Sequence, residues 1–362
     1  AQALVDFEKQ TKSTNASLNQ FATVSAALGG ALALGLGVAA KSFVSFESQM
    51  LAVKAVVGPT VEEFTKLNDL AIKIGRDTAF SAREGASALE ELGKAGVSIA
   101  DILSGAADGA VALAAAAGIG IPEAATLIAN SLNEFALAGD QAGKVADIFA
   151  NVANKSASDA HDFGDALQYV GTKAHALAIP LEDVAAAIAV MADQGISGSS
   201  AGTSLNAALT SLTAPTKEAA ALMKNLGLVT QDQQGNFIGL TSIIEQLAAA
   251  TDGLGNAEKQ EIIAKLFGER GSRAINALLN TQTKELEAAG KGWGDYQDAM
   301  KETGTAATAA ETRLSGVAGA IESLKGALEV AQIQLGSALA PTIKATAEAL
   351  TGLVNAFSSL SP

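Results

Sequence analysis

The stretch PLEDVAAAIAVMADQGISGSSAGTSLNAALTSLTAPTKEAAALMKNLGL, residues 180–228, predicts three short helices separated by two breaks. Pro180 cannot donate a backbone hydrogen bond, so it suits the first turn of a helix. Gly195 ends that helix because glycine adopts the left-handed closing conformation without steric cost. The helix between them presents one apolar face, formed by Leu181, Val184, Ile188 and Met191.

Small residues open the second helix, and a proline separates it from the third. Residues 198–203 read GSSAGT, and Ala214-Pro215-Thr216 precede a third helix at 217–226. Such small residues let two backbones approach closely, or let a helix N-terminus hold a phosphate. The Walker spacing of glycines followed by lysine is missing, which favours close helix packing.

Short motifs follow one another in a set order along the middle of the chain. Phe80, Ser81 and Glu84 come first, and Leu266-Phe267-Gly268 comes last. Between them lie Gly195, Gly202, Thr203 and Pro215. In order and spacing these motifs resemble the core region of the phage tail tape-measure family, over roughly Phe46 to Asn280. The segment 173–178 departs from the family, which tends to have a glycine before the position of Pro180.

This resemblance implies a structural protein of the virion. In that family several copies fill the lumen of a tail tube, their length sets the tail length during assembly, and they leave before or with the DNA. The resemblance also implies contacts with tail-tube subunits and with tail-tip or baseplate proteins. The expected location is therefore the tube lumen or the tail tip.

Composition favours an all-α fold of many short Ala/Gly-rich helices. Apolar residues make up 49% of the 362 residues, but aromatic residues only 4%, and there are 36 glycines. Alanine favours helix, and small side chains allow helices to pack closely around thin cores. Long helices with heptad patterns are expected to flank this compact middle region.

The net charge and the lack of cysteine limit the partners and the chemistry that we expect, and the first residue bears on whether the chain is a fragment. The net charge of −14 disfavours direct nucleic-acid binding, because phosphates need lysine and arginine. The chain has no cysteine, so disulfides and thiol catalysis are excluded. It begins at Ala1 without methionine, so we expect a processed chain or, more readily, a fragment of a longer protein.

Two heptad patterns predict coiled-coil seams in a trimer or hexamer. The first, with polar layers at Thr11, Thr14 and Ser25, has the apolar members Leu4, Phe7, Leu18, Phe21 and Leu28. The second runs until Pro341 interrupts it and contains Leu314, Val317, Ile321, Leu324, Leu328 and Leu335, with Ala331 and Ala338. The alternative for both is an amphipathic helix that folds back on its own core.

Residues 21–40 carry no charge and are long enough to span a bilayer. Gly29, Ala33 and Gly37 recur every fourth residue, which suits membrane helices that touch or any close helix packing. We expect this segment to be surrounded by protein in the assembled state. Insertion into the host envelope on ejection is a second, conditional state.

Four regions are predicted: 1–45 as the N-terminal heptad and hydrophobic helix, 46–285 as the core, 286–312 as a polar hinge, and 313–362 as the C-terminal heptad helices. Trp293, between two glycines, is expected at the hinge. Matches at an offset of 77 or 78 residues suggest two related units, about 85–135 and 163–213. Biased composition is the competing explanation.

No motif indicates an enzyme, and no catalytic, cofactor-binding or metal-ligating residue is predicted. His161 lies near Asp159, Asp162 and Asp165, but a solvated helix N-terminus explains these acids better than a metal site. Two alternatives to the tape-measure role remain open. One is a membrane-active ejection or channel component that inserts 21–40, and the other is a helical-repeat adaptor.

Overall fold

A computed structural model describes residues 37–359, and every regular element in that range is a helix apart from one isolated bridge, Gln231 to Phe237. The first helix covers 37–57. The later elements are α2 (Val61–Asp77), α3 (Ala82–Lys94), α4 (Ile99–Asp101), the π-helix η1 (Ile102–Ala106), α5 (Ala107–Ala117), α6 (Ile121–Glu134), the 3₁₀-helix η2 (Gly139–Gln141), α7 (Ala142–Lys155), α8 (Ala160–Ala176), α9 (Leu181–Asp193), α10 (Gly198–Thr213), α11 (Lys217–Asn225), α12 (Leu240–Ala250), α13 (Asn256–Asn280), α14 (Lys284–Ala288), α15 (Trp293–Met300), α16 (Thr305–Leu314) and α17 (Val317–Ser359). The all-α prediction is confirmed.

Side-chain caps start several helices where the sequence predicts them. The Ser81 hydroxyl accepts from the Glu84 N–H at 3.1 Å, and the Ser81 N–H donates to the Glu84 carboxylate at 2.8 Å. Thr60 and Glu63 form the same reciprocal box at the start of α2. Each box satisfies backbone N–H groups that have no partner within the helix, so these starts are local properties of the sequence.

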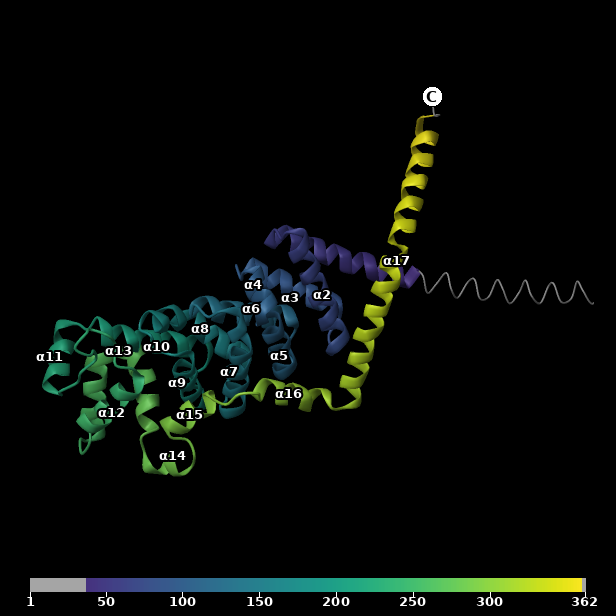
Figure 1. The fold of residues 1–362 in the computed structure, drawn as a ribbon. Coiled ribbons are helices and arrows are strands. Elements are labelled where there is room, and N and C mark those ends of the chain that lie inside the picture. The colour runs from purple at the N-terminus through teal and green to yellow at the C-terminus, as the bar shows by residue number, and fades with distance from the viewer. Residues whose placement is uncertain (1–36, 360–362) are drawn as a thin grey trace, which may run out of the picture.

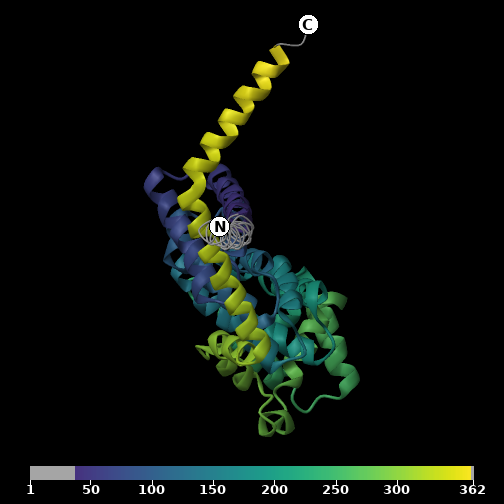
Figure 2. The ribbon, with the colours of Figure 1, turned by 90° about the vertical axis from the view of Figure 1, so that its right-hand side faces the viewer.

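The helices form an elongated body that ends in a single long helix (Figure 1). The chain runs from α2 to α11 along the body, and α12, α14, α15 and α16 lie along its lower side in this view, while α13 packs beside α10. The yellow helix α17 then crosses the beginning of the body, and its C-terminal half extends away from the other helices, as both views show (Figure 2).

The centre of the body is α9, which is buried on all sides. The predicted face of α9 is buried, and so is every residue from Val184 to Ala192. The one-sided prediction for this helix is therefore incomplete. Alanines at the other positions add little bulk, so neighbouring helices α7, α8, α10, α13 and α15 all contact α9.

Left-handed residues end many of these helices. Gly195 has a φ of +78°, and the next N–H, that of Ile196, donates to Met191 O at 2.9 Å. Ala178 takes the same conformation with a φ of +55°, and the Ile179 N–H donates to Ala174 O at 2.9 Å. Ala178 therefore adopts a left-handed backbone conformation that glycine adopts more readily. It lies in the segment where the sequence departs from the family pattern.

Matching turns recur 78 residues apart. The Thr78 hydroxyl donates to Ile74 O at 2.7 Å and accepts from the Phe80 N–H at 3.1 Å. Ser156 makes the corresponding bonds, to Val152 O at 2.8 Å and from the Ser158 N–H at 3.2 Å. These turns join α2 to α3 and α7 to α8. The geometry agrees with the predicted two-unit repeat, which stays a prediction.

Two local predictions are wrong. Trp293 is buried, and its indole N–H donates to Thr241 Oγ1 at 2.9 Å, so it anchors α15 instead of lying at a hinge. Pro341 does not interrupt α17, which continues to Ser359. A proline removes one hydrogen bond from a helix, and here the residue is exposed, so one lost bond does not end a helix of this length.

Candidate interaction surface

The face of α17 that packs on the body is narrow and built around glycines. A Cβ at Gly326 would lie 2.6 Å from Phe80 O, and one at Gly336 would lie 2.5 Å from Ala39 O. Val330 and Ile333 are buried between these glycines. The missing side chains therefore let α17 approach the α2–α3 turn and the helix at 37–57 closely.

Polar contacts fix α17 in this position. Glu329 accepts from the Ala82 N–H at 3.0 Å, so its carboxylate caps the N-terminus of α3 from another helix. The Ser42 hydroxyl donates to Gln332 Oε1 at 2.7 Å. These bonds tie the beginning of the described chain and α3 to the same part of α17.

The opposite face of α17 carries an apolar stripe, which we call the outer stripe. Its large members Val317, Ile321, Leu324, Leu328 and Leu335 are exposed to 79%, 48%, 69%, 56% and 58%. Ala331 and Ala338 are also exposed and complete the heptad. Although α17 does lie on the body, it does so through its other face, and nothing in residues 37–359 covers the outer stripe.

Leu314 does not share a helix with the other members of the second seam. It is the last residue of α16. Ser315 and Gly316 are not helical, and α17 begins at Val317. Leu314 is half-buried at this corner. The predicted first seam, Leu4, Phe7, Leu18, Phe21 and Leu28, lies outside the described residues, as do Gly29 and Ala33.

The helix at 37–57 exposes large apolar side chains that were not predicted from the sequence. Val38, Val44, Leu51 and Val56 are exposed to 51%, 52%, 54% and 39%. Val44 and Leu51, seven residues apart, lie on one side of the helix, away from the buried Phe46, Met50 and Val53, and their spacing could have indicated this side. Gly37 begins this helix, and a Cβ there would meet nothing within 4 Å.

The remaining motif residues hold the body together. A Cβ at Gly202 would collide with the backbone of Ala166, so this glycine sets the contact of α10 with α8. The Thr203 hydroxyl donates to Ser199 O at 2.8 Å within α10. Pro215 lies in the turn before α11, and Gly268, with a φ of +66°, kinks α13. Phe80 is half-buried beside its capping box.

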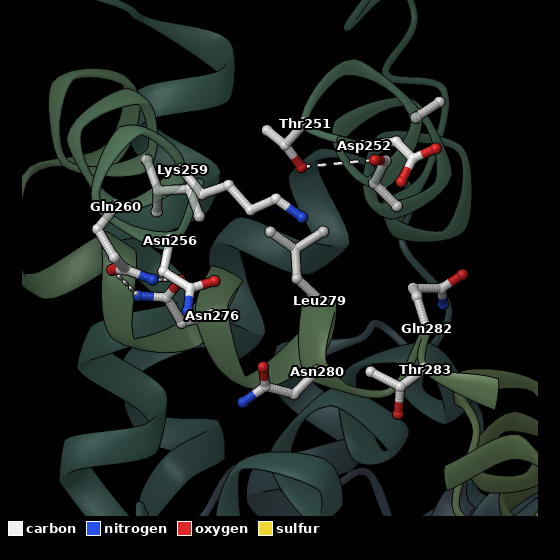
Figure 3. A pocket seen from close by; sticks show the side chains of 13 residues that line it. Thr251, Asp252, Asn256, Lys259, Gln260, Asn276, Leu279, Asn280, Gln282 and Thr283 are labelled. Carbon is white, nitrogen blue, oxygen red and sulfur yellow. Dashed lines mark hydrogen bonds between the residues drawn. The ribbon is translucent and has the colours of Figure 1, made fainter. Parts of the chain in front are cut away.

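A polar pocket of about 600 Å³ lies between the end of α12 and the two halves of α13 (Figure 3). Amide side chains dominate its lining, and Gln260 and Asn276 bond to each other twice, at 3.0 Å each. Asp252 and Lys259 contribute the charges. The pocket offers hydrogen-bond donors and acceptors together with one negative and one positive side chain.

Titratable groups show no metal or catalytic centre in the part of the chain that the structure describes. His161 is exposed and lies 3.8 Å from Glu123 and 3.9 Å from Asp165. Among residues 37–359 no group of three or more His, Cys, Asp or Glu residues is arranged to hold a metal ion. Burial raises the pKa of Glu134 to about 7, and its Oε2 atom, against Gly171, has no hydrogen-bond partner. Burial and the Asp193 carboxylate raise the pKa of Tyr296.

By length and composition, one described helix could cross a membrane, at 99–117. Its 18-residue window is 39% buried in the body, and it contains the π-helical turn at Gly105. Asp101 within it accepts from the Gly139 N–H at 2.8 Å. These contacts join the segment to the neighbouring helices of the body. The predicted membrane segment at 21–40 falls almost wholly outside the described residues.

Comparison with known proteins decides the family. The profile of the family described as phage-related minor tail protein matches residues 68–268, more than half of the chain. Two curated relatives that match two thirds or more of this chain are named tape measure proteins. The chain belongs to the phage tail tape-measure family. The matched region of this tape-measure chain runs from within α2 to the kink of α13, so it covers most of the body but leaves out α14–α16 and the outer stripe.

Two curated relatives carry the same family name. The tape measure protein of Pneumococcus phage Dp-1 is 36% identical over 317 residues, which is 88% of this chain and 27% of that protein. The probable tape measure protein of Escherichia phage P2 is 30% identical over 261 residues, 68% of this chain and 32% of that protein. The chain thus spans about a third or less of these relatives. No solved structure matches it.

Proposed function

We propose that this chain is a folded region of a tape measure that sets tail length during assembly and leaves the tail before or with the DNA. Family membership makes it a structural protein of a phage tail, not an enzyme. The observation that supports a folded region is the body itself. A fully helical chain of 362 residues would span roughly 540 Å, whereas here short helices fold against one another.

The proposal includes several copies, as a trimer or hexamer, in the tube lumen or at the tail tip. The outer stripe supports this, because a large apolar face that the body does not cover is typical of an interaction site. Tail-tube subunits and tail-tip or baseplate proteins are the proposed neighbours. The ruler itself would lie in helices elsewhere in the parent protein.

Deletion of a helical block from the parent gene tests the length role. We expect tails to shorten by about 1.5 Å for each residue removed, as a helical ruler requires. Electron micrographs of the mutant particles give the tail length. Tails of unchanged length would refute the ruler, while substitutions in the body that leave the chain length intact serve as controls.

A second candidate function is membrane activity during ejection. The uncharged segment at 21–40 motivates it. We expect the intact chain to release dye from liposomes and Leu34→Lys to abolish the release. If no lipid composition and no pH gives leakage, this function is wrong.

A further inference from the structure

We infer that residues 7–28 of this chain pack on the outer stripe of α17 as a parallel coiled coil, each seam residue facing the residue 310 positions later. This inference does not depend on the role in the tail. The trimer or hexamer proposed above would then be built from these paired helices.

The two heptads have a common phase. The N-terminal seam occupies positions 7, 11, 14, 18, 21, 25 and 28, and the outer stripe occupies 317, 321, 324, 328, 331, 335 and 338. The steps of four and three therefore occur in the same order in both. Helices pair in parallel when such layers fall level with each other, so one constant offset aligns all of them.

The facing residues of the two heptads are complementary in size. Phe21 faces Ala331, Leu28 faces Ala338, and Ser25 faces Leu335. Large residues opposite small ones fill a core evenly. Pairing of either helix with a copy of itself would instead stack serine on serine or alanine on alanine. The hydroxyls of Thr11 and Thr14 can bond to carbonyls of their own helix.

The described part of the chain begins next to the outer stripe. Ser42 bonds to Gln332, and Ala39 lies against Gly336, so the helix at 37–57 starts beside the last layers of the outer stripe. Figure 1 shows the purple start of this helix crossing α17. The chain between Leu28 and Gly37 spans at most about 30 Å, which is enough for Leu28 to reach the last layers of the stripe.

The favoured occupant is thus the chain's own N-terminal segment. Its seam ends nine residues before the helix at 37–57, which starts beside the last layers of the stripe. Gly29 and Gly30 follow Leu28 directly, and glycines permit the turn that the chain needs before the helix at 37–57. A second copy has no such tether, so its segment would pair at a lower effective concentration.

Disulfide cross-linking of the full chain tests the register, because the sequence contains no cysteine. The in-register variant carries Leu28→Cys and Ala338→Cys. The matched control carries Leu28→Cys and Val317→Cys, which the inferred register separates by about 30 Å. A second in-register pair, Phe21→Cys with Ala331→Cys, covers the case in which the first pair does not fold. Circular dichroism checks each variant, and non-reducing gels report the products.

We expect both in-register pairs to give a cross-linked band of monomer size, forming at least about 10-fold faster than in the control. Equal rates in all variants, or no cross-link in folded in-register variants, would overturn the inference. A dimer-size band from Ala338→Cys alone would also overturn it, since α17 would then pair with α17 of a second copy. That last result would still support the proposed self-association, so the two proposals can fail separately.

Discussion

At the residue scale, the contact of α8 with α10 depends on the missing side chain of Gly202. We expect Gly202→Ala to destabilise the body by about 1–3 kcal/mol, because a Cβ would collide with the Ala166 backbone. Gly143→Ala in α7 is the matched control, since its Cβ would meet nothing within 4 Å, and it should stabilise by up to about 1 kcal/mol. Urea unfolding measures both. Equal effects would contradict the packing role.

A second residue-scale prediction concerns Glu134, whose pKa in the folded chain is about 7 against an ordinary value of 4.5. Between these values the folded state holds a proton that the unfolded state has lost, so stability should fall as pH rises from about 4.5 to 7. Screening limits the loss to roughly 1–2 kcal/mol, because the group is only partly buried.

Glu134→Gln should remove this slope, because glutamine has no proton to lose. Unfolding free energies at pH 4.5, 6 and 8 give the slope for both proteins. The exposed Glu123→Gln serves as the control and should leave the slope unchanged. If Glu134→Gln and the native chain lose stability in parallel, another group is responsible.

At the element scale, the carboxylate of Asp147 in α7 binds the N-terminal end of α16. Asp147 accepts from the Gly304 N–H at 2.8 Å and from the Ala306 N–H at 2.9 Å, at the start of α16. We expect Asp147→Ala to cost about 1–2 kcal/mol locally, because two N–H groups lose a charged acceptor. Hydrogen exchange should speed up in α16 but not in α3. Asp298→Ala, which removes only an ion pair with Lys301 at 3.3 Å, should leave α16 unchanged.

At the scale of the whole molecule, the outer stripe should control the assembly state. We expect Leu324→Lys with Leu328→Lys to convert a trimer or hexamer to a monomer, because the lysines would place charges in the seam. The melting temperature of the body should change little, since both leucines are exposed. Light scattering and small-angle X-ray scattering measure mass and shape.

Ser323→Lys with Ser337→Lys provides the matched control, because both serines are exposed on α17 but lie outside the stripe. It should keep the mass of the native chain. A compact monomer for the native chain itself would refute the assembly and favour an adaptor or a stored form.

The sequence by itself determined the helices and most of their ends. Caps such as Ser81 with Glu84, and the closing residue Gly195, act through bonds within a few residues, so local chemistry suffices. The family could also be recognised from the sequence, because its motifs are short local patterns in the body. It could not show that Trp293 is buried, because its partner Thr241 is 52 residues away.

Only the tertiary structure decided which face of α17 packs on the body. The heptad predicted a coiled-coil seam or, as the alternative, packing of the leucine face on the core. Leucines keep neighbouring backbones apart, whereas Gly326 and Gly336 allow the α2–α3 turn and the helix at 37–57 to approach closely. Backbone contact on the glycine face therefore left the outer stripe exposed. This choice depends on the shapes of the α2–α3 turn and the helix at 37–57, which are distant in the sequence. The periodicity of α17 carries no information about these shapes.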